Sequence, residues 1–388
     1  MSTKSPLFGR RIHIAGSVAN DQRVASTAEV KLARELVQEL VQELVRRGAT
    51  FVVPVDAEKS RPSDGYPICF DWLIWETIHT SLMLRPTDAP LPLVVAVQHH
   101  KTEEQVPEGF IELWDSLRTS DLVQIENAAH WNMYSKRMEI QARWGDILLA
   151  LGGSEGVLFL ANLYHDAGKP VIPLNAALCE PGTGARRLFN FGLSSMQAGR
   201  LFRPSSGNAH ALMNRINFPS RQPVADRVTE IIRLLEDLEP PRAFVARLLD
   251  PAHPEFADVQ DFFDSVAQPI IEGELGYRMT VVDGRQVFDY AWMEQEIFAK
   301  LHRSQVVLVD ITGMRPNCFL ELGYALGRGL PTMLSAKEGL THPFDITTLA
   351  GLHWKVGGSL ADRRVAFREH WDAIRSRPPL VPLEPLIP

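Results

Sequence analysis

The chain has little of what disulfide-bonded, zinc-binding or membrane-spanning proteins require. Its 388 residues include only 3 cysteines, at positions 69, 179 and 318, which lie far apart and form no CxxC pair. A disulfide framework and a zinc site are therefore not expected, and no HExxH or similar histidine spacing indicates another metal site. No stretch approaches the roughly 18 uninterrupted apolar residues of a membrane span, and the N-terminus lacks the apolar region of an export signal. We expect a cytoplasmic protein that does not cross a membrane.

Positive charge is not in excess, because 40 lysines and arginines stand against 47 aspartates and glutamates. The formal net charge is -7 and the pI is about 6.0. Extended nucleic-acid binding requires a basic surface, so it is not expected, whereas a local basic pocket for a small phosphorylated ligand is still compatible with this charge. With 45% apolar and 22% charged residues, the chain is long enough for two or three globular domains.

The order of patterns predicts an α/β protein with two Rossmann-like three-layer units and mainly parallel sheets. A strand at 11–15 precedes a helix whose apolar residues recur at three- and four-residue steps through 36–45, and a strand resumes after Gly48. Paired prolines within EDLEPPR break a helical pattern near 236–242. We expect domains at 1–176 and 240–388, joined by a bridging helical or linker segment at 177–239.

The most informative segment is 303–335, which reads as a strand, a turn and a helix. The strand is a continuous apolar run, VVLV, that ends at Asp310, as in parallel strands covered on both faces. Thr312 and Gly313 lie in the turn, at the strand end where open α/β sheets bind ligands. Glu321 then lies in an otherwise apolar helix. A carboxylate in this position has either a functional role or a structural one, as a helix cap or as the partner of an arginine.

The pattern DITGMRPNCFLELGYALGRGLP resembles the signature of nucleoside 2-deoxyribosyltransferase-like domains, which are related in fold to TIR domains. The resemblance extends from about Pro240 to HPFDI at 342–346. It implies chemistry at an N-glycosidic bond, with Glu321 as nucleophile and with Asp310 and Asn317 contacting the sugar or base. Family members usually carry a further Asp a few residues before the Glu, where this chain has Met-Arg-Pro, so hydrolysis of a nucleotide or plain nucleotide binding is favoured over base transfer.

A glycine-rich turn in the first half predicts a phosphate-binding edge. LGGSEGV at 151–157 lies between a predicted strand and a predicted helix. Glycines allow backbone N–H groups to approach an anion at a helix N-terminus, which favours phosphate. The expected ligand-binding residues are Gly152, Gly153, Ser154, Glu155 and Gly156.

The opening IHIAGSVA, with Gly16 and Ser17, could form a second phosphate-binding edge. Together these segments resemble the SLOG domains, of the type associated with Sir2 and TIR effectors in bacterial defence. Catalytic SLOG members, the LOG enzymes, have Pro-Gly-Gly-x-Gly-Thr and a Glu on the next helical turn. Here Leu151 and Val157 replace the Pro and the Thr, and no acid follows at 158–160. The resemblance therefore implies nucleotide binding without turnover in this half.

The combined interpretation is a defence-type effector. Its SLOG-like half senses a nucleotide signal, such as a cyclic ADP-ribose-type or cyclic oligonucleotide ligand, and controls a C-terminal half that hydrolyses an N-glycosidic bond in a nucleotide such as NAD. No cofactor is required, and a homo-oligomer is expected. A constitutive deoxyribosyltransferase or nucleosidase, a non-catalytic nucleotide-binding protein, and the reversed assignment of sensing and catalysis stay open as alternatives.

Overall fold

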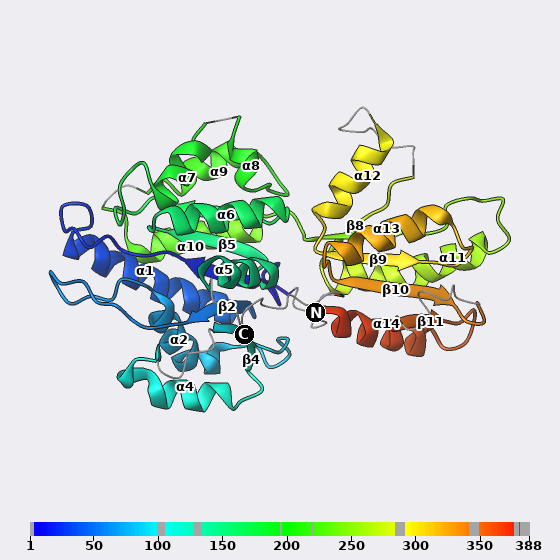
Figure 1. The fold of residues 1–388 in the computed structure, drawn as a ribbon, viewed down its shortest axis with the longest axis horizontal. Helices are drawn as coiled ribbons and strands as arrows, with labels where there is room; N and C mark the ends of the chain where they lie inside the picture. The colour runs from blue at the N-terminus through cyan, green and yellow to red at the C-terminus, as the bar shows by residue number, and fades with distance from the viewer. Residues whose placement is uncertain are drawn as a thin grey trace. The chain divides into compact units, whose positions relative to one another are not determined.

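The computed structural model describes residues 4–98, 105–127, 133–194, 196–218, 221–283, 292–340, 349–375 and 380. These form two compact units that divide between Glu239 and Pro240 (Figure 1). The HPFDI segment, a part of the predicted C-terminal resemblance, lies outside the described residues.

The first unit contains a six-stranded sheet in the order β4-β3-β2-β1-β5-β6, in which all neighbouring strands are parallel. Successive strands run outward from β1 to β4, and the chain then returns to the other side of β1 to form β5. The loops after β1 and β5 therefore flank the switch point, where doubly wound sheets bind ligands. The strands are β1 Arg11–Ala15, β2 Thr50–Val55, β3 Val94–Gln98, β4 Val123–Asn127, β5 Ile147–Leu151 and β6 Val171–Leu174.

The long first helix forms as its periodicity predicts. In α1, Thr27–Arg46, the Ser26 side chain accepts a hydrogen bond from the Glu29 amide at the N-terminus, and Gly48 follows the C-terminus with a φ of 74°. Its buried face packs against α2, Asp71–Thr80, and α10, Val224–Glu236. The other helices of this unit are α4 Ile111–Arg118, α5 Met133–Trp144, α6 Glu155–Asp166, α7 Gly184–Gly192, α8 Ala198–Leu201 and α9 Ala209–Arg215, with short 3-10 turns at Leu82–Leu84 and Glu108–Phe110.

The segment expected to bridge the two domains packs with the first unit. Phe189, Met213 and Ile231 are fully buried in the same hydrophobic cluster as the residues of α1. Helices α7 to α10 thus complete the first unit, whose compact region extends to Glu239 rather than ending near residue 176.

The second unit contains a five-stranded parallel sheet in the order β11-β10-β9-β7-β8. Its strands are β7 Arg242–Ala246, β8 Arg278–Thr280, β9 Val306–Asp310, β10 Thr332–Lys337 and β11 Gly351–Trp354. The helices are α11 Phe256–Phe262, which continues through π-helical turns at Phe263–Ala267 and Pro269–Glu274, then α12 Met293–His302, α13 Pro316–Gly327 and α14 Leu360–Arg375. The switch point of this sheet lies between β7 and β9.

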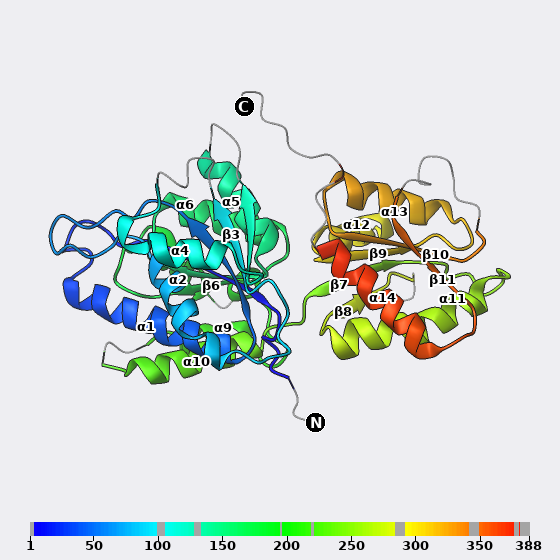
Figure 2. The same cartoon turned by 90° about the horizontal axis from the view of Figure 1, so that it is seen from below.

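Helices cover both faces of the second sheet (Figure 2). One face, with Val306 and Leu308, packs on α11 and α14, and the opposite face, with Val307 and Val309, packs on α12 and α13. Burial on both faces explains the unbroken apolar run of β9. The predicted fold class, two Rossmann-like α/β units with mainly parallel sheets, is confirmed. Within the described residues, no helix is both long and apolar enough to cross a membrane.

Candidate functional site

Asp310, the last residue of β9, is fully buried and hydrogen-bonded on both oxygens. Oδ1 accepts from the Thr312 amide at 3.0 Å, and Oδ2 accepts from Ser335 Oγ at 2.7 Å and Trp354 Nε1 at 2.8 Å. Burial raises the pKa of Asp310, and these three donors partly offset the increase. The carboxyl group therefore fixes the loop after β9 rather than facing a ligand directly.

Glu321 lies in the middle of α13 and is partly buried. Burial raises the pKa of its carboxyl group from 4.5 to about 7. It has no hydrogen-bond or ion-pair partner among the residues that the structure describes. Burial raises the pKa of the Cys318 thiol to about 12, and the negative charge of Glu321 adds to this increase. A desolvated carboxyl group without a structural partner is a candidate for chemistry.

Of the three predicted catalytic residues, Asp310 is fully buried, and its charge and that of Glu321 both act on Cys318 of α13. Asp310 contacts Trp354, which belongs to the face covered by α11 and α14, whereas Glu321 belongs to α13 on the opposite face. Asn317 is exposed in the first turn of α13, on the same helix as Glu321. Glu321 and Asn317 are therefore the pair that a common ligand could contact, and Asp310 supports the loop before them.

The predicted ligand-binding residues Thr312 and Gly313 have structural contacts of their own. The Thr312 hydroxyl accepts a hydrogen bond from the Lys337 amide at 2.9 Å and is buried. Gly313 has a φ of 84°, and a Cβ there would lie 3.2 Å from His253 Cε1. The glycine is thus required by backbone conformation and by close packing of the loop.

Sequence reasoning missed a basic group beside Asp310. Arg247 follows β7, and its guanidinium lies 4.8 Å from the ring centroid of Phe263. Burial lowers the pKa of Arg247, while the carboxylates of Asp264 and Asp310 oppose that change. Its Nε and Nη1 are buried without a hydrogen-bond partner among the described residues. Its position directly after a strand next to β9 was the signal available in the sequence.

The predicted phosphate turn of the first unit comes together as expected, but its glycines contact protein backbone. The Gly153 amide donates to the Ser17 carbonyl at 2.7 Å, and a Cβ at Gly152 would lie 2.3 Å from the same oxygen. A Cβ at Gly16 would lie 1.7 Å from the Leu151 carbonyl oxygen, and the Ala185 amide of α7 donates to the Gly152 carbonyl. These glycines are needed for close packing whether or not a ligand binds.

The helix that follows the turn has an open N-terminus. Ser154 and Glu155 are exposed, and Ser154 makes no side-chain capping bond. A Cβ at Gly156 would lie 3.2 Å from Met138 Cε of α5. The first amides of α6 are the part of the predicted site that can still face an anion.

A cluster of ionisable side chains lies near the ends of β1 and β2. An isolated bridge pairs Ser17 with Cys69 and so places the loop before α2 beside the loop after β1. Burial raises the pKa of Asp71, the first residue of α2, to about 7, and the charges of Asp56 and Glu58 add to the increase. Arg137 of α5 lowers the Asp71 pKa and forms an ion pair with Asp56. The sequence left Asp71 as either a structural partner or a ligand contact, and burial makes it a second carboxyl group with a raised pKa.

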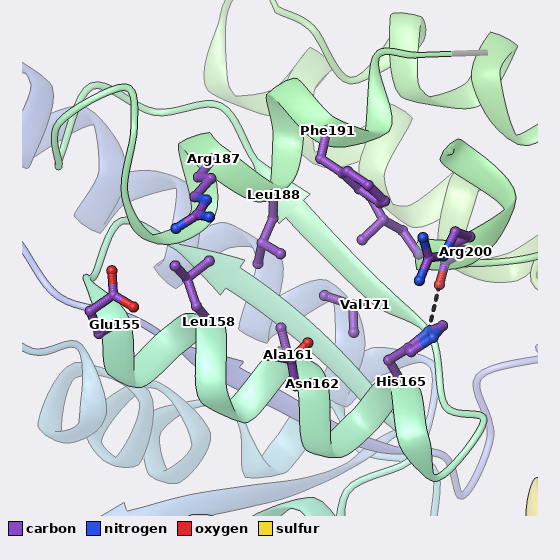
Figure 3. Close-up of a pocket in the computed structure, with 11 residues that line it drawn as sticks. Glu155, Leu158, Ala161, Asn162, His165, Val171, Arg187, Leu188, Phe191 and Arg200 are labelled. Carbon is purple, nitrogen blue, oxygen red and sulfur yellow. Dashed lines mark hydrogen bonds between the residues drawn. The ribbon is translucent and has the colours of Figure 1, made fainter. Parts of the chain in front are cut away.

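A cavity of about 460 Å³ lies between α6, α7 and α8 in the first unit (Figure 3). Its lining residues are Glu155, Leu158, Ala161, Asn162, His165, Val171, Arg187, Leu188, Phe191, Arg200 and Leu201. Of the predicted ligand-binding residues, only Glu155 lines it. No group of three or more metal-ligating side chains suited to a metal ion occurs in the described parts of the chain.

These features define a protein of two doubly wound α/β units, each with a carboxyl group of raised pKa near its strand ends. Residues 7–235 match the family described as ATP nucleosidase Cap17-like, N-terminal. The match covers more than half of the chain, so the protein belongs to this family. A comparison with curated proteins found no match. Among solved structures, the X-ray structure of TM1055, a structural genomics target, is 16% identical; the alignment covers 47% of this chain and 81% of that chain, with a TM-score of 0.28.

Proposed function

We propose that this protein hydrolyses the N-glycosidic bond of a nucleotide and that Glu321 is the catalytic carboxyl group. The observation that carries the proposal is Glu321 itself, a partly buried carboxyl group with a pKa of about 7 and no partner among the described residues. ATP is the first substrate to test, because the matched family is described by ATP nucleosidase activity. NAD is the second, because it also carries N-glycosidic bonds.

The chemistry requires little beyond a positioned carboxylate. Ionised Glu321 attacks the anomeric carbon, the carbon–oxygen bond to the enzyme forms, and the bond to the base nitrogen breaks. Water then cleaves the glycosyl ester, releases the sugar phosphate and restores the carboxylate. Adenine leaves with a proton supplied by water, whereas nicotinamide leaves as a neutral base and the proton from water goes to solvent. With a pKa of about 7, a substantial fraction of Glu321 is ionised at neutral pH.

The first unit acts in this proposal as the nucleotide-sensing part of a defence-type effector. The open N-terminus of α6 and the switch point between β1 and β5 support nucleotide binding there. A cyclic nucleotide that binds this unit would raise the rate of base release by the second unit. Self-association would bring several copies of the catalytic unit under the same control.

One observation favours a second candidate, in which the first unit carries the chemistry. The family match lies in that unit, and Asp71 there also has a pKa raised to about 7 by burial. This arrangement reverses the assignment of sensing and catalysis between the two units.

Base release from ATP, NAD and deoxynucleosides, with and without cyclic nucleotides, tests both candidates. We expect Glu321→Gln to abolish release of adenine or nicotinamide and Asp71→Asn to preserve it. The converse result would favour the second candidate, and activity in both variants would contradict both. Glu369→Gln, at an exposed position of α14, is the matched control. Turnover of free deoxynucleosides without an activating ligand would indicate a constitutive deoxyribosyltransferase or nucleosidase instead.

A further inference from the structure

The cavity between α6, α7 and α8 has the composition of a nucleotide-binding site. We propose that it binds an anionic nucleotide, with phosphate groups at Arg187 and Arg200 and the base against Phe191. The proposal is independent of which carboxyl group performs catalysis, because it concerns binding and is tested by direct titration.

The size and walls of the cavity suit a small organic ligand. Its volume of about 460 Å³ lies within the usual range for ligand pockets. Apolar side chains form much of the lining, including Leu158 and Ala161 of α6 and Leu188 of α7. Polar side chains, including Asn162 and His165 of α6, form the rest of the lining, so the cavity combines apolar contact with polar and charged groups.

Two arginines give the cavity its positive charge. Arg187, in the first turns of α7, has no side-chain hydrogen bond or ion pair among the described residues. Figure 3 shows it near Glu155, and shows Arg200 with His165 farther along α6. His165 Nδ1 donates to the Arg200 backbone carbonyl at 2.9 Å, which holds α8 against α6. Guanidinium groups bind phosphate through paired N–H donors.

Phe191 of α7 supplies an aromatic ring to the cavity lining. Phe191 is 38% exposed, and the Arg200 guanidinium carbon lies 5.7 Å from its ring centroid. An accessible ring next to an arginine offers a stacking surface for a base. Asn162, also in the lining, supplies an amide for hydrogen bonds to the base or the ribose.

The length of the cavity favours a nucleotide over a single phosphate ion. Glu155 and His165 are ten positions apart on α6, which corresponds to about 15 Å along the helix axis. Glu155 opposes an anion at its end of the cavity, but its carboxylate can accept a hydrogen bond from a ribose hydroxyl. The lining therefore selects a ligand that combines phosphate, ribose and base.

Binding at this cavity would act directly on the glycine-rich turn. Gly184, the first residue of α7, has a φ of 50°, and a Cβ there would lie 2.2 Å from the Gly153 carbonyl oxygen. A shift of α7 on ligand binding must therefore move the turn or break this packing. The glycines of the turn pack against α7, so the accessible surface here consists of the cavity and the exposed N-terminus of α6.

Isothermal titration calorimetry of the full chain tests the site. The probes are AMP, ADP and ATP, with adenosine and tripolyphosphate as the separate halves of the ligand, and chromatography checks that each probe stays intact. We expect Arg187→Gln and Arg200→Gln each to weaken nucleotide binding about tenfold or more, and Phe191→Ala to weaken it about five- to tenfold. Arg203→Gln, at an exposed arginine outside the cavity lining, should bind like the unchanged protein.

The Leu158→Trp variant distinguishes loss of the binding site from loss of the fold. The larger side chain fills the cavity without removing a charge, and it should abolish binding while the circular dichroism spectrum is retained. Unchanged affinity in both arginine variants, or no binding of any nucleotide, would overturn the proposal. Equal affinity for tripolyphosphate and ATP would contradict the role of Phe191 in base recognition.

Discussion

Replacing Glu321 with Gln should stabilise the protein at high pH while it removes catalysis. The carboxyl group has a pKa of about 7 in the folded protein and 4.5 as its ordinary value. Because the unfolded chain ionises first as the pH rises, folding stability falls between about pH 4.5 and about pH 7 and is constant above that range. Gln carries no charge, so the variant avoids this loss.

The magnitude follows from the pKa difference. At about 1.4 kcal/mol for each pH unit between the two values, full burial would give about 3 kcal/mol. Glu321 is only partly buried, so solvent screening reduces the expected gain to about 1–2 kcal/mol at about pH 8. For a domain of this size, that corresponds to an increase in Tm of about 2–8 °C.

Differential scanning calorimetry of the full chain at about pH 5 and about pH 8 measures the effect. We expect Glu321→Gln to raise the transition of the second unit more at about pH 8 than at about pH 5. Glu369→Gln, at an exposed position of α14, should show no such difference. An equal change at both pH values, or a loss of stability confined to about pH 8, would refute the pKa argument.

Three further results are expected. The kcat/KM for base release should rise with pH and level off above about 7, because Glu321 must be ionised to attack; a fall with pH in a pH–rate profile would indicate a general acid. Gly152→Ala should destabilise the first unit by about 2 kcal/mol or more in urea unfolding, because φ is 69° and the new Cβ would lie 2.3 Å from a backbone oxygen. The control Gly182→Ala places its Cβ in open space and should leave the free energy of unfolding nearly unchanged. Trp354→Phe removes one donor from the buried Asp310 and should cost about 1–3 kcal/mol by the same measurement, and an unchanged urea midpoint would contradict a structural role for that bond.

Elements defined by local periodicity could be predicted from the sequence. The apolar steps of α1 and the unbroken apolar run of β9 each follow from which faces are buried. The packing of residues 177–239 could not be predicted in this way. Ile231 is buried in the first unit because α10 packs against α1, a contact between segments far apart in the chain.

The sequence predicted that Asp310 ends a strand and that Glu321 lies on the following helix, but it did not predict which face of the sheet each acid belongs to. Side chains alternate along β9, so Asp310 shares a face with Leu308, which packs against α11 and α14. Glu321 lies on the other face, because α13 packs against Val309. The sequence does not state which helix covers which face, so the faces of the two acids could not be predicted from it.

The cluster near Asp71 could not be predicted from the sequence for a different reason. It depends on the bridge between Ser17 and Cys69 and on Arg137, which approaches from a helix more than sixty positions later. None of these pairs has a spacing that sequence periodicity could reveal.

Hydrogen bonding separates the structural acid from the catalytic candidate in the second unit. Burial raises the pKa of both Asp310 and Glu321, so a raised pKa does not by itself identify the group that reacts. Asp310 accepts three hydrogen bonds, which hold its carboxyl group in place and leave it no access to a ligand. Glu321 is desolvated without such compensation among the described residues, a cost that folding alone does not explain. A ligand that contacts Glu321 would supply the missing interaction, and this is why the catalytic role is assigned to Glu321 rather than to the more deeply buried Asp310.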